Sequence, residues 1–143
     1  MVNQVEVHPF YQQEEAKKWM DKYSVQIEAW APFGEGRGNM FQNPVLNEIG
    51  KKYGKSAAQV ILRWHLQRGV VVIPKSTHIE RMQENLNVFD FALSAEDMAR
   101  IAALDTKVSA SFPTMTRLRW NGLQIWWKNT KRTMTVQKKK RNW

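Results

Sequence analysis

Segments of strand character alternate with helical segments along the first 105 residues. The strand candidates are Val2–Val7, Val25–Trp30 and Val70–Ile73. The first is alternating and β-branched, and the third is an unbroken apolar run closed by Pro74, which predicts a parallel strand buried on both faces. Strands that alternate with helices predict parallel βα units.

Five helices are expected from apolar periodicity and from capping signals. Ser94 with Asp97 and Thr77 with Glu80 have the three-residue spacing of a capping box. The loop over residues 31–42 is too rich in glycine for regular structure. The expected helices are Gln12–Tyr23 (with Ala16, Trp19, Met20 and Tyr23 at helical spacing), Pro44–Tyr53, the segment from the Ser56 cap to Gly69, His78–Leu86 and the segment from Ser94 to Leu104.

Length and composition narrow the class further. A chain of 143 residues suits one modest domain, and three strands are too few to close a barrel, which typically needs about 250 residues. The pattern alone therefore predicts an incomplete α/β domain. The chain has no cysteine, no apolar run long enough to span a membrane and no signal-peptide pattern, so a cytoplasmic protein is expected. No spacing of His, Asp and Glu suggests a metal site.

The net charge of +9 is unevenly distributed. All 13 acidic residues lie within residues 1–105, whereas residues 106–143 hold 10 of the 22 Lys and Arg residues and four of the seven tryptophans. We therefore divide the chain into a nearly neutral globular segment, residues 1–105, and an irregular basic tail, residues 106–143. The basic character belongs to the tail alone.

Several strings in the first segment resemble the aldo-keto reductases, in particular the bacterial 2,5-diketo-D-gluconate reductase-like branch. They are NQVEVHPF, IEAWAPFGEG, GKSAAQVILRWHLQRGVVVIPKST and IERMQENLNVFDFALSAEDMARIAALD. The resemblance covers residues 2–105. It implies that the segment is the C-terminal portion of a (β/α)₈ TIM barrel, supplying the sixth, seventh and eighth strands and the helices that follow.

A group of polar residues follows the apolar strand: Lys75, Ser76, Thr77 and, one helical turn further, Arg81. Two cations, two hydroxyl groups and the positive end of a helix can form a phosphate site on the face where barrel enzymes bind their ligands. The alternative is a capped surface helix with solvated charges. The resemblance implies that these four residues hold the 2′-phosphate of NADP(H), and that Glu84 and Asn85 contact its adenine.

Other positions match the family's contacts to the rest of the cofactor. The resemblance implies that Gln4 hydrogen-bonds the nicotinamide carboxamide and that Trp30 stacks on the nicotinamide ring. Phe33 and Gly34 fall where the family wraps a loop over the pyrophosphate, and Glu35 is a poorer neighbour for phosphate. From the residues alone, a strand-end indole can equally be buried as core, and a buried glutamine needs partners in any fold.

The expected function is reduction of aldehydes or ketones by hydride transfer from NADPH. The resemblance implies four catalytic residues: an aspartate, a tyrosine, a lysine and a histidine. It places all of them before the NQVEVHP string, so we expect this truncated chain to have none and to be inactive alone. His8, His65 and His78 are not read as catalytic. Half a barrel leaves sheet edges unpaired, so self-association, or pairing with a complementary fragment, is expected.

The tail admits more than one interpretation. Shifted back by one nucleotide, codons compatible with the stretch from Pro113 can read His-Tyr-Asp-Pro-Leu-Thr-Val-Glu-Trp-Phe, which suggests a frameshift after about Thr106. Alternatively, its cations and indoles bind nucleic acid or other polyanions, or lie on a membrane surface. The residues that would do so are Arg117, Arg119, Trp120, Trp126, Trp127, Lys128 and the KKKR run.

Overall fold

The computed structural model describes residues 1–111, of which Met1–Ala110 form one compact unit. Most of the basic tail therefore lies outside the described residues, including the stretch predicted to result from a frameshift and the candidate polyanion-binding residues. Within the described part, no helix is long and apolar enough to cross a membrane, and no group of three His, Cys, Asp or Glu side chains is placed to hold a metal ion.

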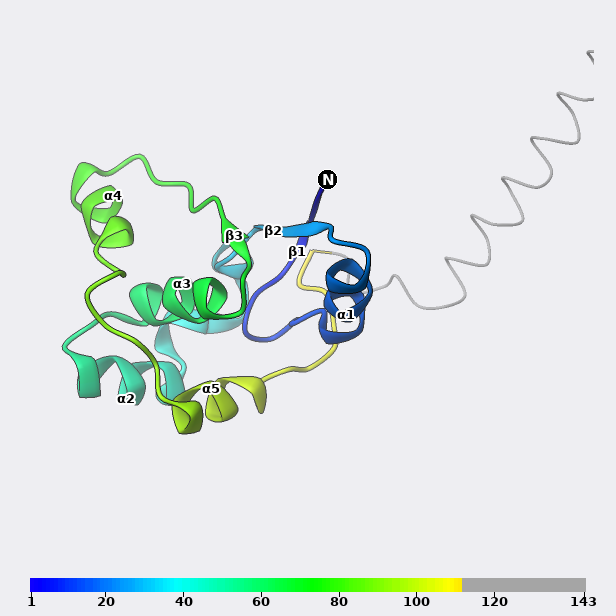
Figure 1. The fold of residues 1–143 in the computed structure, drawn as a ribbon. Coiled ribbons are helices and arrows are strands. Elements are labelled where there is room, and N and C mark those ends of the chain that lie inside the picture. The colour runs from blue at the N-terminus through cyan, green and yellow to red at the C-terminus, as the bar shows by residue number, and fades with distance from the viewer. Residues whose placement is uncertain (112–143) are drawn as a thin grey trace, which may run out of the picture. The chain divides into compact units, whose positions relative to one another are not determined.

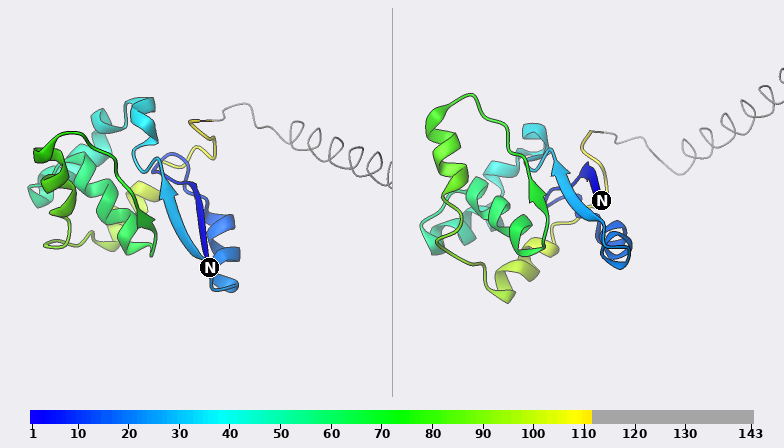
Figure 2. Two further views of the ribbon diagram at one scale, coloured as in Figure 1. Left: turned by 90° about the horizontal axis from the view of Figure 1, so that it is seen from above. Right: turned by 45° about the horizontal axis from the view of Figure 1, so that its top comes forward.

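Three parallel strands form the sheet, in the order β1-β2-β3 (Figure 2). Their bounds are β1 Val2–Glu6, β2 Gln26–Trp30 and β3 Val71–Val72. The register pairs Gln4 with Glu28 and Ala29 with Val72. The prediction of three parallel strands connected by helices is confirmed, although the third strand is only two residues long.

Five α-helices occupy the predicted segments, most of them with shorter bounds. They are α1 Glu14–Lys22, α2 Pro44–Tyr53, α3 Ala57–Gln67, α4 Ile79–Leu86 and α5 Ala95–Ala102. Helix α1 lies at one end of the unit and α4 at the other, with the sheet and α3 between them (Figures 1 and 2). This arrangement separates the surface around α4 from the β1 edge.

Two capping boxes fix the starts of α3 and α5. The side chain of Ser56 accepts the N–H of Gln59, whose side chain returns to the Ser56 N–H, and Ser94 and Asp97 do the same. The predicted box of Thr77 with Glu80 is wrong. The N-cap is His78, which has extended backbone angles and accepts the first helical hydrogen bond from Met82, so Thr77 lies one residue too early.

The core lies on one face of the sheet. Val7, Ile27, Ala29 and Val70 are buried there together with apolar residues of the helices. The opposite face of β3 is open, because Val71 is 42% and Ile73 49% exposed. The prediction that Val70–Ile73 is buried on both faces is therefore wrong: α3 contacts β3, and no described segment covers the other face.

The glycine-rich loop is irregular, as its composition predicts, but contains 3₁₀ turns. Two short 3₁₀ segments, joined across a kink, make up η1 Gly34–Gln42. Glu35 and Asn39 adopt positive φ angles of 53° and 50°. Gly34, Gly36 and Gly38 also have positive φ. Such angles are uncommon outside glycine, so this loop carries local strain of the kind that gathers at functional sites.

Residues after α5 stay in contact with the unit as far as Ala110. Glu6, at the end of β1, accepts hydrogen bonds from Ser109 Oγ at 2.5 Å and from the Ala110 N–H at 2.8 Å. Arg37 of η1 donates to the Ala110 carbonyl at 2.8 Å. The division of the chain after residue 105 stays a prediction, because the structure describes too little of the tail.

Candidate functional site

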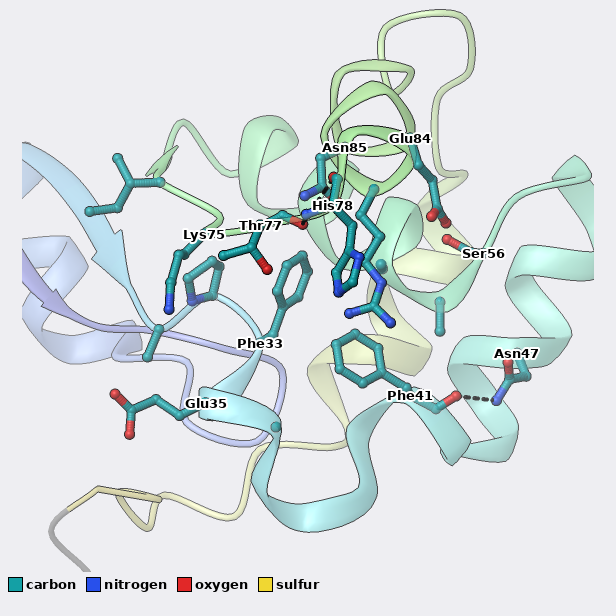
Figure 3. A pocket seen from close by; sticks show the side chains of 18 residues that line it. Phe33, Glu35, Phe41, Asn47, Ser56, Lys75, Thr77, His78, Glu84 and Asn85 are labelled. Atoms are coloured by element: carbon teal, nitrogen blue, oxygen red, sulfur yellow. Dashed lines mark hydrogen bonds between the residues drawn. The ribbon is translucent and has the colours of Figure 1, made fainter.

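An open pocket of about 930 Å³ lies between η1, the start of α3 and the start of α4 (Figure 3). The segment from Ile73 to His78, which links β3 to α4, forms one side of it. Phe33 and Phe41 of the glycine-rich region and Asn47 of α2 form the other. The pocket is therefore built where a parallel strand gives way to a helix, the position at which α/β folds place ligands.

Seven of the ten predicted site residues line this one pocket. Lys75 and Arg81 are both among them, so the two cations face the same space. Figure 3 shows Lys75 near one end of the pocket, on the same side as Glu35, and Glu84 near the other end with Ser56. The seven residues are Phe33, Lys75, Ser76, Thr77, Arg81, Glu84 and Asn85.

The two cations of the pocket have no protein partner in the described part of the chain. Seven ion pairs join charged side chains there, and neither Lys75 nor Arg81 belongs to any of them. Neither donates a side-chain hydrogen bond within residues 1–111. Both side chains are exposed and line one cavity, so an anion bound there could pair with two cations that no protein group in the described residues occupies.

The start of α4 adds backbone donors to this part of the pocket. Its N-cap, His78, makes no side-chain capping hydrogen bond, so no side chain satisfies the first N–H groups of the helix. Ser76 holds the turn before it: its hydroxyl accepts the His78 N–H at 3.1 Å and donates to the His78 carbonyl at 3.2 Å. The Ser76 hydroxyl thus positions the helix start, and free N–H groups there suit an anion.

An aromatic pair forms the floor of the pocket. The rings of Phe33 and Phe41 are 5.4 Å apart at an interplanar angle of 55°. Asn47 Nδ2 donates to the Phe41 carbonyl at 2.9 Å, which ties η1 to α2. Rings held in this way present apolar surface to a flat ligand beside the cationic end.

Three predicted site residues lie outside the pocket. Gln4 and Trp30 lie on β1 and β2, on the face of the sheet away from the core, and Gln4 Nε2 donates to Glu28 at 2.7 Å. Gly34 is buried with φ at +58°, where a Cβ would meet Met40 Cε at 3.2 Å. Its lack of a side chain therefore serves the packing of η1 in this structure.

Sequence reasoning missed several residues of the pocket. The sequence pattern indicates Ser56 only as a helix cap and His78 only as the start of a helix. Phe41 and Asn47 carry no local signal, because their approach to α4 depends on how η1 and α2 pack. The only sequence pattern that could have indicated this side of the pocket is the pair of aromatic residues near the two ends of the glycine-rich loop, Phe33 and Phe41.

Buried histidines lie outside the pocket and are structural. Burial, together with the nearby Arg68 guanidinium, lowers the pKa of His65 to about 3. Burial also lowers the pKa of His8, against the effect of Glu6, whose carboxylate is 3.1 Å from His8 Nε2. Both imidazoles are therefore neutral at pH 7.

Comparison with known proteins decides the family. The sequence profile of the aldo/keto reductase family matches residues 1–106. The chain belongs to the aldo/keto reductase family. It is 48% identical over 106 residues to the 9,11-endoperoxide prostaglandin H2 reductase of Trypanosoma cruzi (strain CL Brener), and 41% identical over 105 residues to the methylglyoxal reductase DkgA of Escherichia coli (strain K12). Each match covers 73% of this chain and 38% of the relative.

Solved structures agree with this assignment. The crystal structure of a Gox0644 mutant in complex with NADPH matches 75% of this chain and 39% of its own, with a TM-score of 0.72 and 42% identity. The resemblance inferred from the sequence strings is thus confirmed, and the described α/β unit corresponds to part of the (β/α)₈ barrel of aldo/keto reductases. This chain spans a little over a third of the length of these relatives.

Proposed function

We propose that this aldo/keto reductase chain binds NADP(H) in the pocket between η1, α3 and α4. The single observation that carries the proposal is the meeting of Lys75 and Arg81 in one cavity without protein partners. The family membership and the NADPH-bound relative support the same ligand.

The residues present fit the adenosine end of the cofactor. Lys75, Arg81 and the open N–H groups of α4 would hold the 2′-phosphate, and Thr77 would add a hydroxyl. Ser76 would contribute indirectly, because its hydroxyl holds the turn that positions the start of α4. Glu84 and Asn85 line the same pocket one turn further along α4. The Glu84 carboxylate would accept a hydrogen bond from the adenine edge, and the Asn85 side-chain amide would donate one to it.

The other end of the cofactor would lie along the open face of the sheet. Gln4 and Trp30 share that face, since Gln4 pairs with Glu28 and Trp30 lies two residues further along β2. We propose that Gln4 orients the nicotinamide carboxamide and Trp30 offers its half-buried indole to the ring. Phe33 would contact the cofactor between the two ends, and Gly34 would keep the chain at the start of η1 in its turn. When bound, NADPH supplies a hydride that reduces a carbonyl carbon.

The activity that we propose for the whole protein is reduction of small aldehydes or ketones in the cytoplasm. For a polypeptide of these 143 residues, we propose cofactor binding without turnover, because none of its residues matches the acid that protonates the carbonyl oxygen in the family. Incubation of the purified polypeptide with NADPH and methylglyoxal tests this part. We expect no cofactor oxidation above the rate without protein, and steady turnover would contradict the proposal.

Titration calorimetry of the full chain with NADP⁺ tests the binding site. Arg81→Ala removes a charge-assisted contact of about 1.5–3 kcal/mol, which corresponds to a loss of affinity of roughly tenfold to 100-fold. The matched control is Lys18→Ala, which removes one exposed cation from α1 at the far end of the unit. Equal affinity of wild type, Arg81→Ala and Lys18→Ala would contradict the assignment.

A further inference from the structure

Helix α4 carries an apolar stripe that faces solvent. Ile79, Met82 and Leu86 recur at spacings of three and four residues, so they share one side of the helix, yet they are 69%, 44% and 71% exposed. We call these three residues the α4 stripe. A helix as short as α4 is unstable in water by itself and depends on the packing of its apolar face. Within residues 1–111 that face is left uncovered, because no residue of α4 is buried.

The described residues hold α4 from its other sides. Gln59 Nε2 of α3 donates to the carbonyls of Glu84 at 3.1 Å and Asn87 at 3.0 Å. Glu84 and Asn85 are the half-buried residues of α4, and both line the pocket. These contacts attach the helix to α3 and leave the α4 stripe free to meet a further segment.

Both outer strands of the sheet have an open edge. The order β1-β2-β3 makes β1 and β3 the edge strands, and no other described strand pairs with them. Helix α1 lies at the β1 end of the unit (Figures 1 and 2), and its Trp19 and Tyr23 stack on each other in solvent, 59% and 65% exposed. An unpaired edge strand beside exposed apolar side chains is a surface to which a further strand and helix can add.

The exposed apolar side chains form two flanks, one at each end of the sheet. At roughly 100 Å² for each side chain, they offer about 800 Å², which is the area that one partner buries in a standard interface. A partner that uses all of this area must reach both ends of the sheet. The β1 flank consists of Val2, Trp19 and Tyr23, and the β3 flank consists of Val71, Ile73 and the α4 stripe.

A second copy of this chain does not fit both flanks. A two-fold dimer joins one flank to the same flank of the other copy, so the second flank of each copy stays open. Two three-stranded sheets also hold fewer strands than the eight of the family's barrel. The rest of such a barrel does fit, because this chain spans 38% of its relatives, close to the share that three of eight strands represent.

We propose that the two flanks dock the other strands and helices of an aldo/keto reductase barrel when these are offered as a separate polypeptide. The partner adds one parallel strand beside β1 and another beside β3, and its helices cover the α4 stripe and the stacked Trp19 and Tyr23. The two polypeptides then share one closed sheet with no open edge. This docking does not depend on the cofactor site, so it succeeds or fails independently of the proposed function.

Co-expression tests the docking. The full chain, carrying an affinity tag, is produced together with the untagged part of Escherichia coli DkgA that lies outside its match to this chain. We expect the DkgA part to stay soluble and bound through affinity purification, and analytical ultracentrifugation to give the mass of one chain plus one DkgA part. Amide hydrogen exchange in β1 and β3 should be slower in the complex than in the chain alone.

Leu86→Lys tests whether the α4 stripe belongs to the interface. Leu86 is exposed in the chain alone, so the substitution leaves the fold intact, whereas in the complex it buries a charge without a partner. The amount of DkgA part retained by the chain should fall about tenfold. The matched control is Ala99→Lys, which adds the same charge at an exposed position of α5 and should retain the DkgA part as wild type does. Far-ultraviolet circular dichroism confirms that each variant is folded.

Two kinds of result overturn the proposal. The first is a chain that purifies without the DkgA part or only as an oligomer of itself, including the case in which the DkgA part stays insoluble although the chain is present. The second is equal retention of the DkgA part by Leu86→Lys and Ala99→Lys, which would place the α4 stripe outside the contact.

Discussion

His65 makes the stability of this chain depend on acid in a way that one substitution can isolate. Its side chain is fully buried in α3, with its ring edge against Trp64 at a centroid distance of 4.7 Å. Burial lowers the pKa of His65 to about 3, whereas an unfolded chain protonates histidine near pH 6.5. The native state therefore holds a neutral imidazole across the whole range in which the unfolded state takes up a proton.

This difference in pKa between the native and the unfolded state sets the direction and the size of the change in the free energy of unfolding with pH. Because the unfolded chain binds more protons below pH 6.5, the contribution of His65 is complete above that pH and is lost as the pH falls toward 3. Each pH unit costs about 1.4 kcal/mol, so acidification to pH 5 lowers the free energy of unfolding by roughly 2 kcal/mol, and to pH 3 by about 5 kcal/mol. A domain stable by about 5–15 kcal/mol loses much of its margin in this range.

Urea unfolding of wild type and His65→Gln, followed by tryptophan fluorescence between pH 8.5 and pH 5, measures this contribution. We expect His65→Gln to be less stable at pH 8, because glutamine brings polar groups into the buried site, but to lose about 2 kcal/mol less than wild type between pH 6.5 and pH 5. Between pH 7.5 and pH 8.5 the two curves should run parallel, which is the internal control. Parallel curves down to pH 5 would refute a neutral buried imidazole.

Three further predictions concern other parts of the fold. Gly50→Ala should lower the free energy of unfolding by about 1–3 kcal/mol, because a Cβ there overlaps the Lys55 carbonyl, and a urea melt measures it. Asp97, 2% exposed, accepts hydrogen bonds from Tyr53 at 2.5 Å and Lys52 at 2.9 Å. Burial opposes ionisation of Asp97, but its hydrogen bonds prevail and the pKa lies below the usual value, so Asp97→Asn should cost stability at pH 7 and progressively less as the pH falls below about 4. Finally, we propose that the open sheet edges and the exposed Val2, Val71 and Ile73 make the polypeptide self-associate. Analytical ultracentrifugation should show an average mass that rises with protein concentration. A clean monomer at a protein concentration of about 100 μM would contradict this.

Local signals in the sequence were enough to place most helices. Ser94 with Asp97 and Ser56 with Gln59 form capping boxes through contacts three residues apart, so the residues alone specify these helix starts. Thr77 with Glu80 has the same spacing but forms none, because Ser76 holds the turn and His78 takes the cap position. Spacing alone cannot reveal this competition between neighbouring side chains.

Burial and the pocket walls depended on contacts between distant segments. The spacing of Trp19 and Tyr23 is typical of a buried stripe on α1, yet both side chains are exposed and stack on each other. Met20 is the residue of α1 that is buried. The cationic side of the pocket could be predicted, since Lys75 and Arg81 lie on the two sides of a strand-to-helix junction, just before α4 and in its first turn. Phe41 and Asn47 could not, because they approach α4 only through the packing of η1 and α2.

The central claim is that the pocket beside α4 recognises the extra phosphate of NADP(H). The most direct measurement is the ratio of the dissociation constants of the full chain for NAD⁺ and NADP⁺ at pH 7 and constant ionic strength. Charge-assisted contacts from Lys75 and Arg81 to the 2′-phosphate predict a preference for NADP⁺ of roughly tenfold or more. A ratio of one, with both dinucleotides bound, would contradict the account.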